Sequence, residues 1–156
     1  MNGDPPVVLL LSGPNLNLLG QRQPEVYGTD TLDDHVARAR GVAEARGLRL
    51  EHTQANAEGE LVEAVQAARG RVAAIVVNAG AVTHYGWSLH DALAAFDGPV
   101  VELHLSNPVA REPWRRVSVV APVAAGSVAG FGGLGYELAV EAAARLLELS
   151  LPPSPS

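Results

Sequence analysis

A glutamate and a histidine stand two residues apart in the segment ELHLSN, residues 102–107. Residues two apart on a β-strand share a face, so the Glu102 carboxylate can hold the His104 imidazole in one orientation. A carboxylate that orients an imidazole is a common arrangement for a general acid or base. A hydrogen-bonded histidine with a purely structural role fits this spacing equally well, so the pair alone does not decide the chemistry.

An arginine and a tyrosine lie five residues apart, as Arg22 and Tyr27, within a loop predicted over residues 13–30. A loop longer than ~12–15 residues in a compact domain is commonly a lid or a disordered segment. A guanidinium close to a phenol lowers the phenol pKa, which would let Tyr27 act as a base. The alternative is a solvated arginine beside a tyrosine that anchors the loop, and this segment alone favours that alternative.

Amide, imidazole and carboxylate groups follow one another between Asn78 and Asp91. The segment from Asn78 to His84 reads NAGAVTH, and Asp91 lies in the next predicted helix. Such groups suit a ligand that carries several hydroxyls. A metal site is the alternative, but His84, His90 and His104 show no recognised ligand spacing, so we predict no metal.

Strand and helix signals alternate along the chain and predict the elements that carry these residues. Apolar or alternating runs predict β-strands at residues 7–12, 48–53, 72–78, 100–105 and 117–122. Helical spacing predicts α-helices from a cap at Thr31 to Gly47 and at residues 58–69, 87–96 and 134–149. Thr31 and Asp34 have the spacing of a capping box.

This alternation indicates a parallel sheet covered by helices on both faces. We therefore predict an α/β fold, a flavodoxin-like three-layer sandwich whose five-stranded parallel sheet has the order 2-1-3-4-5. The prediction is a single domain over residues 1–156, with frayed tails at residues 1–6 and 151–156.

Polar residues gather where the predicted strands end. In folds of this kind, ligands bind beyond the carboxyl ends of the strands. The polar residues at four of these ends are Asn15, Asn17, Gln54, Asn56, Asn78, His104, Ser106 and Asn107. They predict a ligand site at one edge of the sheet, although asparagine and serine that merely serve the turns are the alternative.

The composition excludes several classes of function. The chain has no cysteine, and all eleven of its basic Lys and Arg residues are arginine. A lysine Schiff base, a P-loop lysine and a cysteine nucleophile are therefore excluded. The net charge of −6 argues against nucleic acid as a partner. The apolar run at residues 7–11 lacks a basic flank and is too short to span a bilayer, so we expect a cytoplasmic protein without membrane contact.

Two further motifs are interpreted as backbone geometry only. Residues 130–135, GFGGLG, satisfy the pattern G-x-G-x-x-G, but no strand with an acidic residue ~20 positions on follows, as a dinucleotide fingerprint needs. Residues 86–90, GWSLH, lack the second glycine of a nucleophile elbow.

Six stretches spread over nearly the whole chain carry a family resemblance. They are GPNLNLLGQRQPEVYG (13–28), QANAEGELV (54–62), NAGAVTH (78–84), VELHLSN (101–107), AREPWRR (110–116) and GFGGLGYELA (130–139). In this order they resemble the type II 3-dehydroquinate dehydratases. The resemblance implies a flavodoxin-like fold, assembly into a homododecamer, and activity without a cofactor or a metal.

The resemblance also implies a reaction, the dehydration of 3-dehydroquinate to 3-dehydroshikimate on the route to chorismate and the aromatic amino acids. It proceeds by anti elimination through an enolate. By position, Tyr27 would take the C2 proton, with Arg22 stabilising its phenolate. Asn15 would hold a water at the enolate oxygen. His104, held by Glu102, would protonate the leaving C1 hydroxyl.

The remaining residues carried over by position would bind the substrate. They are Asn78, Gly80, His84, Asp91, Leu105, Ser106, Arg111 and Arg115. Asn78, His84 and Asp91 would contact substrate hydroxyls, and the amides of Leu105 and Ser106 would meet the substrate carboxylate. Arg115 would contact a substrate hydroxyl, and Arg111 would help to close the lid.

The chain departs from the family pattern at Gln23, Ala55, Ala79, Tyr85, Gly86, Trp87, His90 and Val117. None of these changes removes the base or the acid, but those at 85–87 lie beside a substrate-contacting helix. Two alternatives stay open. One is a flavodoxin-like module that binds a nucleotide or a flavin, and the other is a catalytically weakened paralogue that serves assembly or regulation.

Overall fold

A computed structural model describes residues 3–21 and 23–150, and its centre is a five-stranded parallel β-sheet. The strands are β1 (Val7–Ser12), β2 (Arg49–Gln54), β3 (Ala74–Asn78), β4 (Val100–His104) and β5 (Gly126–Ala129). Their spatial order is β2-β1-β3-β4-β5, which confirms the predicted topology. Arg22 and residues 151–156 of the expected tail, with residues 1–2, lie outside the described part of the chain.

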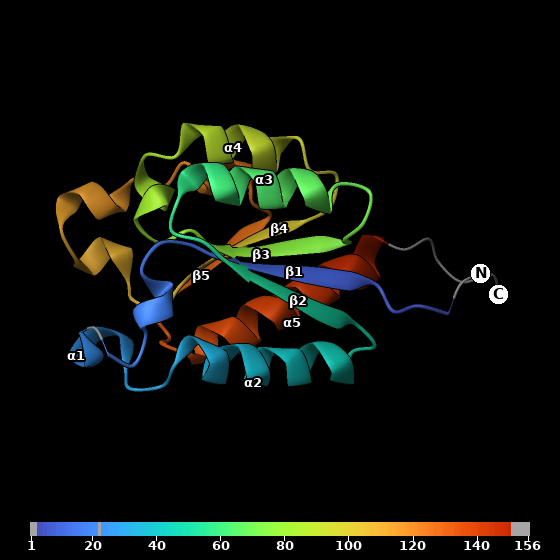
Figure 1. The fold of residues 1–156 in the computed structure, drawn as a ribbon, viewed down its shortest axis with the longest axis horizontal. Coiled ribbons are helices and arrows are strands. Elements are labelled where there is room, and N and C mark those ends of the chain that lie inside the picture. Colours follow the sequence, from blue (N-terminus) through green and yellow to red (C-terminus); the bar gives the residue numbers. More distant parts are fainter. Residues whose placement is uncertain (1–2, 22, 151–156) are drawn as a thin grey trace.

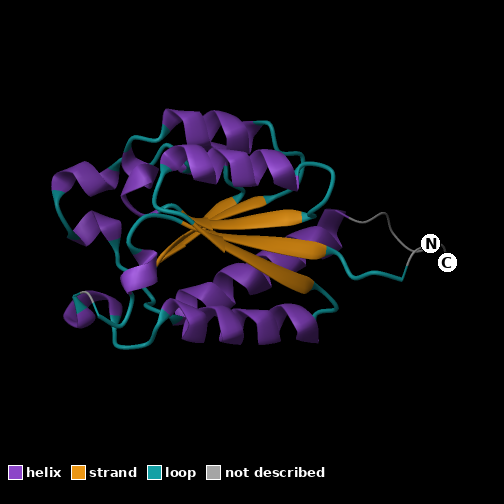
Figure 2. Ribbon diagram, viewed as in Figure 1, coloured by secondary structure: helices purple, strands orange, loops and turns teal. Residues whose placement is uncertain are grey.

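Helices cover both faces of the sheet, as Figures 1 and 2 show. On one face lie α2 (Leu32–Ala45) and α5 (Leu134–Ser150), and on the other lie α3 (Glu58–Ala68) and α4 (Trp87–Ala94). A short helix α1 (Pro24–Tyr27) and five 3₁₀ helices occupy the connections, at Leu16–Leu18, Gly80–His84, Pro108–Ala110, Pro113–Arg116 and Ala121–Val123. No helix in the described ranges is both long and apolar enough to cross a membrane.

The alternation of side chains along the central strands divides the interior into two cores. All six residues of β1 are buried, as expected for a strand with helices on both sides. Val8 and Leu10 pack towards α2 and α5, whereas Leu9 and Leu11 pack with Val65 and the other apolar residues of the opposite layer. The central strands therefore contribute apolar side chains to both cores.

The predicted cap of α2 is present as a reciprocal pair of hydrogen bonds. The Asp34 amide donates to Thr31 Oγ1 at 3.1 Å, and the Thr31 amide donates to Asp34 Oδ2 at 2.9 Å. These bonds satisfy two backbone donors that the first turn of a helix otherwise leaves free. The hydrogen bonds from Thr31 also lower the pKa of the Asp34 carboxyl.

The prediction of the fifth strand was wrong. Residues 117–122 form no strand, and β5 lies later, at Gly126–Ala129. Val119 and Val120 are buried as core side chains without ladder pairing. The Ser118 hydroxyl accepts hydrogen bonds from the amides of Val120 and Ala121, which turns the chain into the following 3₁₀ helix. The burial of Val119 and Val120 therefore accounts for part of the apolar run, but the run does not pair as a strand.

The loops at the carboxyl ends of β1 and β3 are in close contact. A Cβ added to Gly13 would lie 2.5 Å from the carbonyl oxygen of Ala79, so only glycine fits there. The Gly13 amide donates to the Asn78 carbonyl oxygen at 2.8 Å. This contact brings the polar residues after the two strands to one place.

Candidate active site

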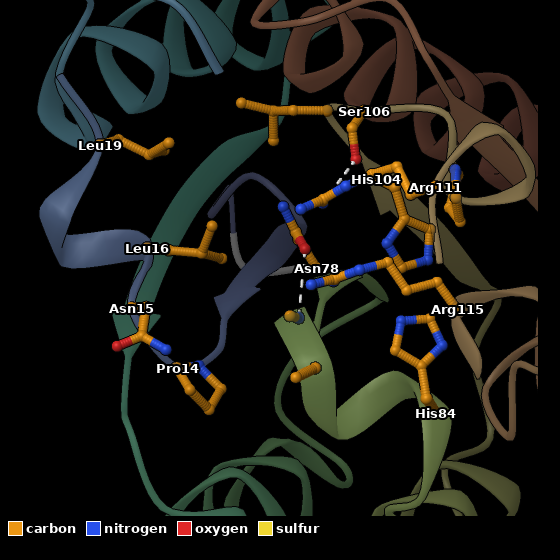
Figure 3. Close-up of a pocket in the computed structure, with 14 residues that line it drawn as sticks. Pro14, Asn15, Leu16, Leu19, Asn78, His84, His104, Ser106, Arg111 and Arg115 are labelled. Atoms are coloured by element: carbon orange, nitrogen blue, oxygen red, sulfur yellow. Dashed lines mark hydrogen bonds between the residues drawn. The ribbon is translucent and has the colours of Figure 1, made fainter. Parts of the chain in front are cut away.

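A cleft opens at the carboxyl ends of β1, β3 and β4, at the edge of the sheet predicted to bind a ligand (Figure 3). Its lining residues come from the loops after these strands and from the segment 105–115. They are Pro14, Asn15, Leu16, Leu19, Asn78, Gly80, Ala81, His84, His104, Leu105, Ser106, Pro108, Arg111 and Arg115. Nine of the thirteen residues assigned from the sequence therefore share one cleft.

The His104 imidazole is held by a buried carboxylate at the end of β4. His104 Nε2 lies 2.7 Å from Glu102 Oε2, and the side chain of Glu102 is almost wholly buried. The hydroxyl of Ser118 donates to the same oxygen at 2.7 Å, and the hydroxyl of Ser127 donates to Glu102 Oε1 at 3.0 Å. Because Nε2 is engaged, Nδ1 is the ring nitrogen left for a ligand.

These contacts keep Glu102 ionised. Burial acts to raise the pKa of the Glu102 carboxyl, but the hydrogen bonds from His104, Ser118 and Ser127 outweigh it and lower the pKa. A carboxylate that stays ionised beside an imidazole stabilises the protonated ring. The Glu102 carboxylate therefore fixes the orientation of the His104 ring at the cleft.

The two serines were not identified from the sequence. Ser118 lies in the segment wrongly predicted as a strand, and Ser127 lies in the strand that was missed. In the β4–β5 pairing Ser127 stands opposite Glu102, so correct placement of β5 would have indicated its role. No local signal marks Ser118.

The His84 ring lies parallel to the His104 ring, with the centroids 6.3 Å apart. Its Nδ1 is 2.6 Å from the Val117 carbonyl oxygen, which requires a proton on Nδ1 and leaves Nε2 as an acceptor in the neutral ring. Burial lowers the pKa of His84, and the neighbouring His104 and Arg115 act in the same direction. A neutral imidazole of this kind can accept a hydrogen bond from a hydroxyl.

Amide groups line the side of the cleft formed by β1 and β3. Asn78 is buried, and its Oδ1 accepts a hydrogen bond from the Gly80 amide at 3.3 Å. Asn15 adopts a left-handed backbone conformation with a φ of 69°, which asparagine tolerates. The Asn15 amide donates to Asn56 Oδ1 at 3.0 Å, and Gln54 Nε2 donates to the same oxygen at 3.1 Å.

Two guanidinium groups give the cleft its positive charge. Arg111 Nη1 donates to the Ser106 hydroxyl at 3.2 Å, and Arg115 Nε donates to Glu112 Oε2 at 2.8 Å. Both arginine side chains are largely buried, with 16% exposed. Guanidinium groups suit carboxylate ligands because their N–H groups match the two carboxylate oxygens.

Four of the assigned residues do not line the cleft. Glu102 lies behind His104, and Asp91 is exposed on α4. Arg22 lies outside the described residues, and of Tyr27 only the backbone, the last residue of α1, is described. The described residues thus bring together an imidazole held by a carboxylate, amide groups and two guanidinium groups.

The glycine run at residues 130–135 serves the chain itself. The amides of Gly130 and Gly132 donate to the carbonyl oxygens of His104 and Leu105, at 3.3 and 2.9 Å. A Cβ on Gly133 would collide with the His35 ring. Because these amides are engaged, they form no phosphate cradle. Within residues 3–21 and 23–150, no group of three or more His, Asp or Glu side chains is placed to hold a metal ion.

Comparison with known proteins identifies the family. Residues 6–144 match the family described as Dehydroquinase class II. The chain is 53% identical over 139 residues to a 3-dehydroquinate dehydratase of Hyphomonas neptunium, covering 89% of this chain and 93% of the relative. It is 51% identical over 134 residues to a catabolic 3-dehydroquinase of Aspergillus clavatus, covering 86% and 89%.

A solved structure agrees with these sequence matches. The type II dehydroquinase of Butyrivibrio crossotus superposes with a TM-score of 0.86 at 34% identity, covering 88% of this chain and 97% of that one. The chain therefore belongs to the class II dehydroquinases, the enzymes known as type II 3-dehydroquinate dehydratases.

Proposed function

We propose that the cleft removes water from 3-dehydroquinate to give 3-dehydroshikimate, by anti elimination through an enolate. The observation that carries this proposal is the buried Glu102–His104 pair, which faces two arginines and the Asn78 amide across one cleft. The substrate is a carboxylate with several hydroxyls and a ketone. Loss of water from a β-hydroxy ketone needs a base, a stabiliser of the enolate oxygen and an acid.

In this proposal two proton transfers flank the enolate. The Tyr27 phenolate, stabilised by Arg22, takes the C2 proton, and the electron pair moves onto the ketone oxygen. Asn15 orients a water that donates a hydrogen bond to that oxygen. The enolate then collapses, the C1–O bond breaks, and the His104 imidazolium gives its proton to the departing hydroxyl, which leaves as water. Glu102 stabilises the imidazolium until that transfer.

Substrate binding is assigned to the remaining polar groups of the cleft. Asn78, Gly80, His84 and Arg115 would meet the hydroxyl side of the substrate. The amides of Leu105 and Ser106 would receive the carboxylate, and Arg111, bound to the Ser106 hydroxyl, would close over it. Asp91 is omitted, because it is exposed on α4 and lines no part of the cleft.

We further propose that the protein acts in the cytoplasm as a homododecamer. The dodecamer follows from the family resemblance. Large apolar side chains on the surface support self-association, among them Phe131 and Val109, which are each 61% exposed. Light scattering coupled to size-exclusion chromatography measures the mass directly. A monomeric or dimeric mass at working concentration would contradict this assembly.

Turnover of purified protein tests the activity. The product is a conjugated enone, so its ultraviolet absorbance rises as substrate is consumed. We expect this rise with added 3-dehydroquinate and no added metal or cofactor. Tyr27→Phe removes the proposed base and should abolish the rise, whereas Tyr85→Phe, which changes an exposed phenol, is the matched control. A folded protein that binds 3-dehydroquinate without turnover would instead indicate a weakened paralogue.

A further inference from the structure

Trp114 connects two residues of the cleft without lining it. Its indole meets the His84 ring edge to face, with the centroids 5.2 Å apart and the planes at 88°. The Arg115 guanidinium carbon lies 4.1 Å from the centre of the indole ring. We propose that Trp114 is a positioning residue, which holds His84 and Arg115 in the orientations that bind substrate. The inference rests on the substrate-binding roles proposed above.

The first effect of Trp114 concerns the rotation of the His84 ring. The Val117 carbonyl holds Nδ1 at 2.6 Å, and the indole packs against the ring at 88°. Figure 3 shows His84 and Arg115 beside one another, next to His104. A ring that turned over would put Cδ2 in the place of Nδ1 and Cε1 in the place of Nε2. The indole restrains that motion, so Nε2 stays available to a substrate hydroxyl.

The second effect concerns Arg115. Its Nε donates to Glu112 Oε2 at 2.8 Å, and its guanidinium lies over the indole face. A cation over an aromatic ring is attracted to the electron-rich face, most strongly for tryptophan. A long side chain that is already ordered loses less conformational entropy when ligand binds. The 3₁₀ helix Pro113–Arg116 therefore presents a preformed guanidinium to the cleft.

The exposure of the Trp114 side chain argues against a role in core packing. Trp114 is 50% exposed, so removal of its ring leaves no closed cavity in the core. Trp87 offers a matched comparison. It is 62% exposed, and its ring lies 5.2 Å from that of His90, but His90 does not line the cleft. Trp87 therefore contacts a histidine outside the cleft, whereas Trp114 contacts two residues that line it.

Kinetics of three variants test the proposal. Trp114→Leu should raise KM about tenfold with a much smaller change in kcat, since it weakens ground-state and transition-state binding alike. Trp114→Phe, which keeps an aromatic ring, should recover most of that loss, and Trp87→Leu should leave KM unchanged. In protein that already carries His84→Ala and Arg115→Ala, Trp114→Leu should add nothing. An unchanged KM in Trp114→Leu would overturn the proposal. So would a full rise in KM when Trp114→Leu is added to the protein that carries His84→Ala and Arg115→Ala.

A fluorescence measurement tests the contact without turnover. The chain has two tryptophans, so Trp87→Phe leaves Trp114 as the only one. A protonated imidazole quenches indole emission, so emission should fall as acid protonates His84, whose other charged or titratable neighbours are His104, Arg115 and Glu102. His84→Ala should remove the transition. If it persists unchanged, the positioning proposal fails, whereas absent turnover in the unmodified protein would contradict the proposed function.

Discussion

The end of β4 and the 3₁₀ helix Gly80–His84 each present an imidazole to the same cleft, and the two rings are nearly parallel. They differ in the oxygen that holds them. His104 is bound to the Glu102 carboxylate, which two serine hydroxyls hold in a buried site. His84 is bound to a backbone carbonyl. One ring therefore faces a full negative charge and the other a neutral dipole.

This difference indicates how one residue type can serve two roles 6.3 Å apart. A carboxylate partner stabilises the imidazolium, which a general acid needs before it gives up its proton. A carbonyl partner fixes the tautomer with far less charge stabilisation, and burial lowers the pKa of His84, so this ring stays neutral. In the proposed mechanism the partner oxygen, rather than the histidine, sets the role.

The largest expected effect is that of His104→Ala. Loss of a positioned general acid should lower kcat by ~10²–10⁴-fold. The fold should persist, because His104 lies at the cleft and packs in neither core. Enone absorbance measures kcat, and circular dichroism measures the unfolding temperature. Near-native turnover would show that His104 is structural and would remove the distinction between the two rings.

Glu102→Gln keeps the shape of the partner and removes its charge. Hydrogen bonds to charged groups are worth ~1–2 kcal/mol more than neutral ones, so kcat should fall by about tenfold.

The lowered pKa of Glu102 also makes a prediction about stability. Its stabilising contribution is present above the unfolded pKa and is lost as pH falls through the lower folded value.

The pH dependence of unfolding separates the charge from the shape. Between neutral pH and the acid range, Glu102→Gln should lose less stability than the unmodified protein, because the variant has no carboxyl to protonate at this position. Urea titrations at several pH values give the free energies of unfolding. Parallel acid profiles would mean that folding does not lower the pKa of the Glu102 carboxyl.

His84→Ala should act on binding more than on chemistry. Loss of one neutral hydrogen bond costs ~0.5–1.5 kcal/mol, so KM should rise by up to about tenfold while kcat changes little. Steady-state kinetics of the two variants measure both parameters. We expect mainly a higher KM for His84→Ala and mainly a lower kcat for His104→Ala. A fall in kcat as large as that of His104→Ala would mean that both rings take part in proton transfer.

The last prediction is that borohydride has no effect on activity. Both rings are proposed to act without a covalent intermediate, and the chain has no lysine with which a substrate ketone could form a Schiff base. Borohydride added together with substrate should therefore leave activity unchanged. Mass spectrometry of the treated protein provides the check. A covalent adduct accompanied by loss of activity would contradict acid–base elimination.

Much of the architecture follows from local patterns. The apolar run at β1, the Thr31–Asp34 cap of α2 and the helical spacing of α5 act within a few residues of one another, so they can be recognised in the sequence. The Glu102–His104 contact could be predicted for the same reason, because alternate residues of one strand share a face. The amide and imidazole groups after the strands are brought together by the parallel topology itself.

The sequence by itself determined four of the five strands, the order of the sheet, and the types of group that gather at its carboxyl edge. The tertiary structure alone decided where β5 pairs, and with it which serines hold Glu102 and why residues 117–122 are apolar without forming a strand. It also decided that Trp114 packs against His84. The contacts of Glu102 with the two serines and of Trp114 with His84 join residues 16 to 30 positions apart. They depend on how distant elements pack against one another, and short-range patterns of residue types do not predict that packing.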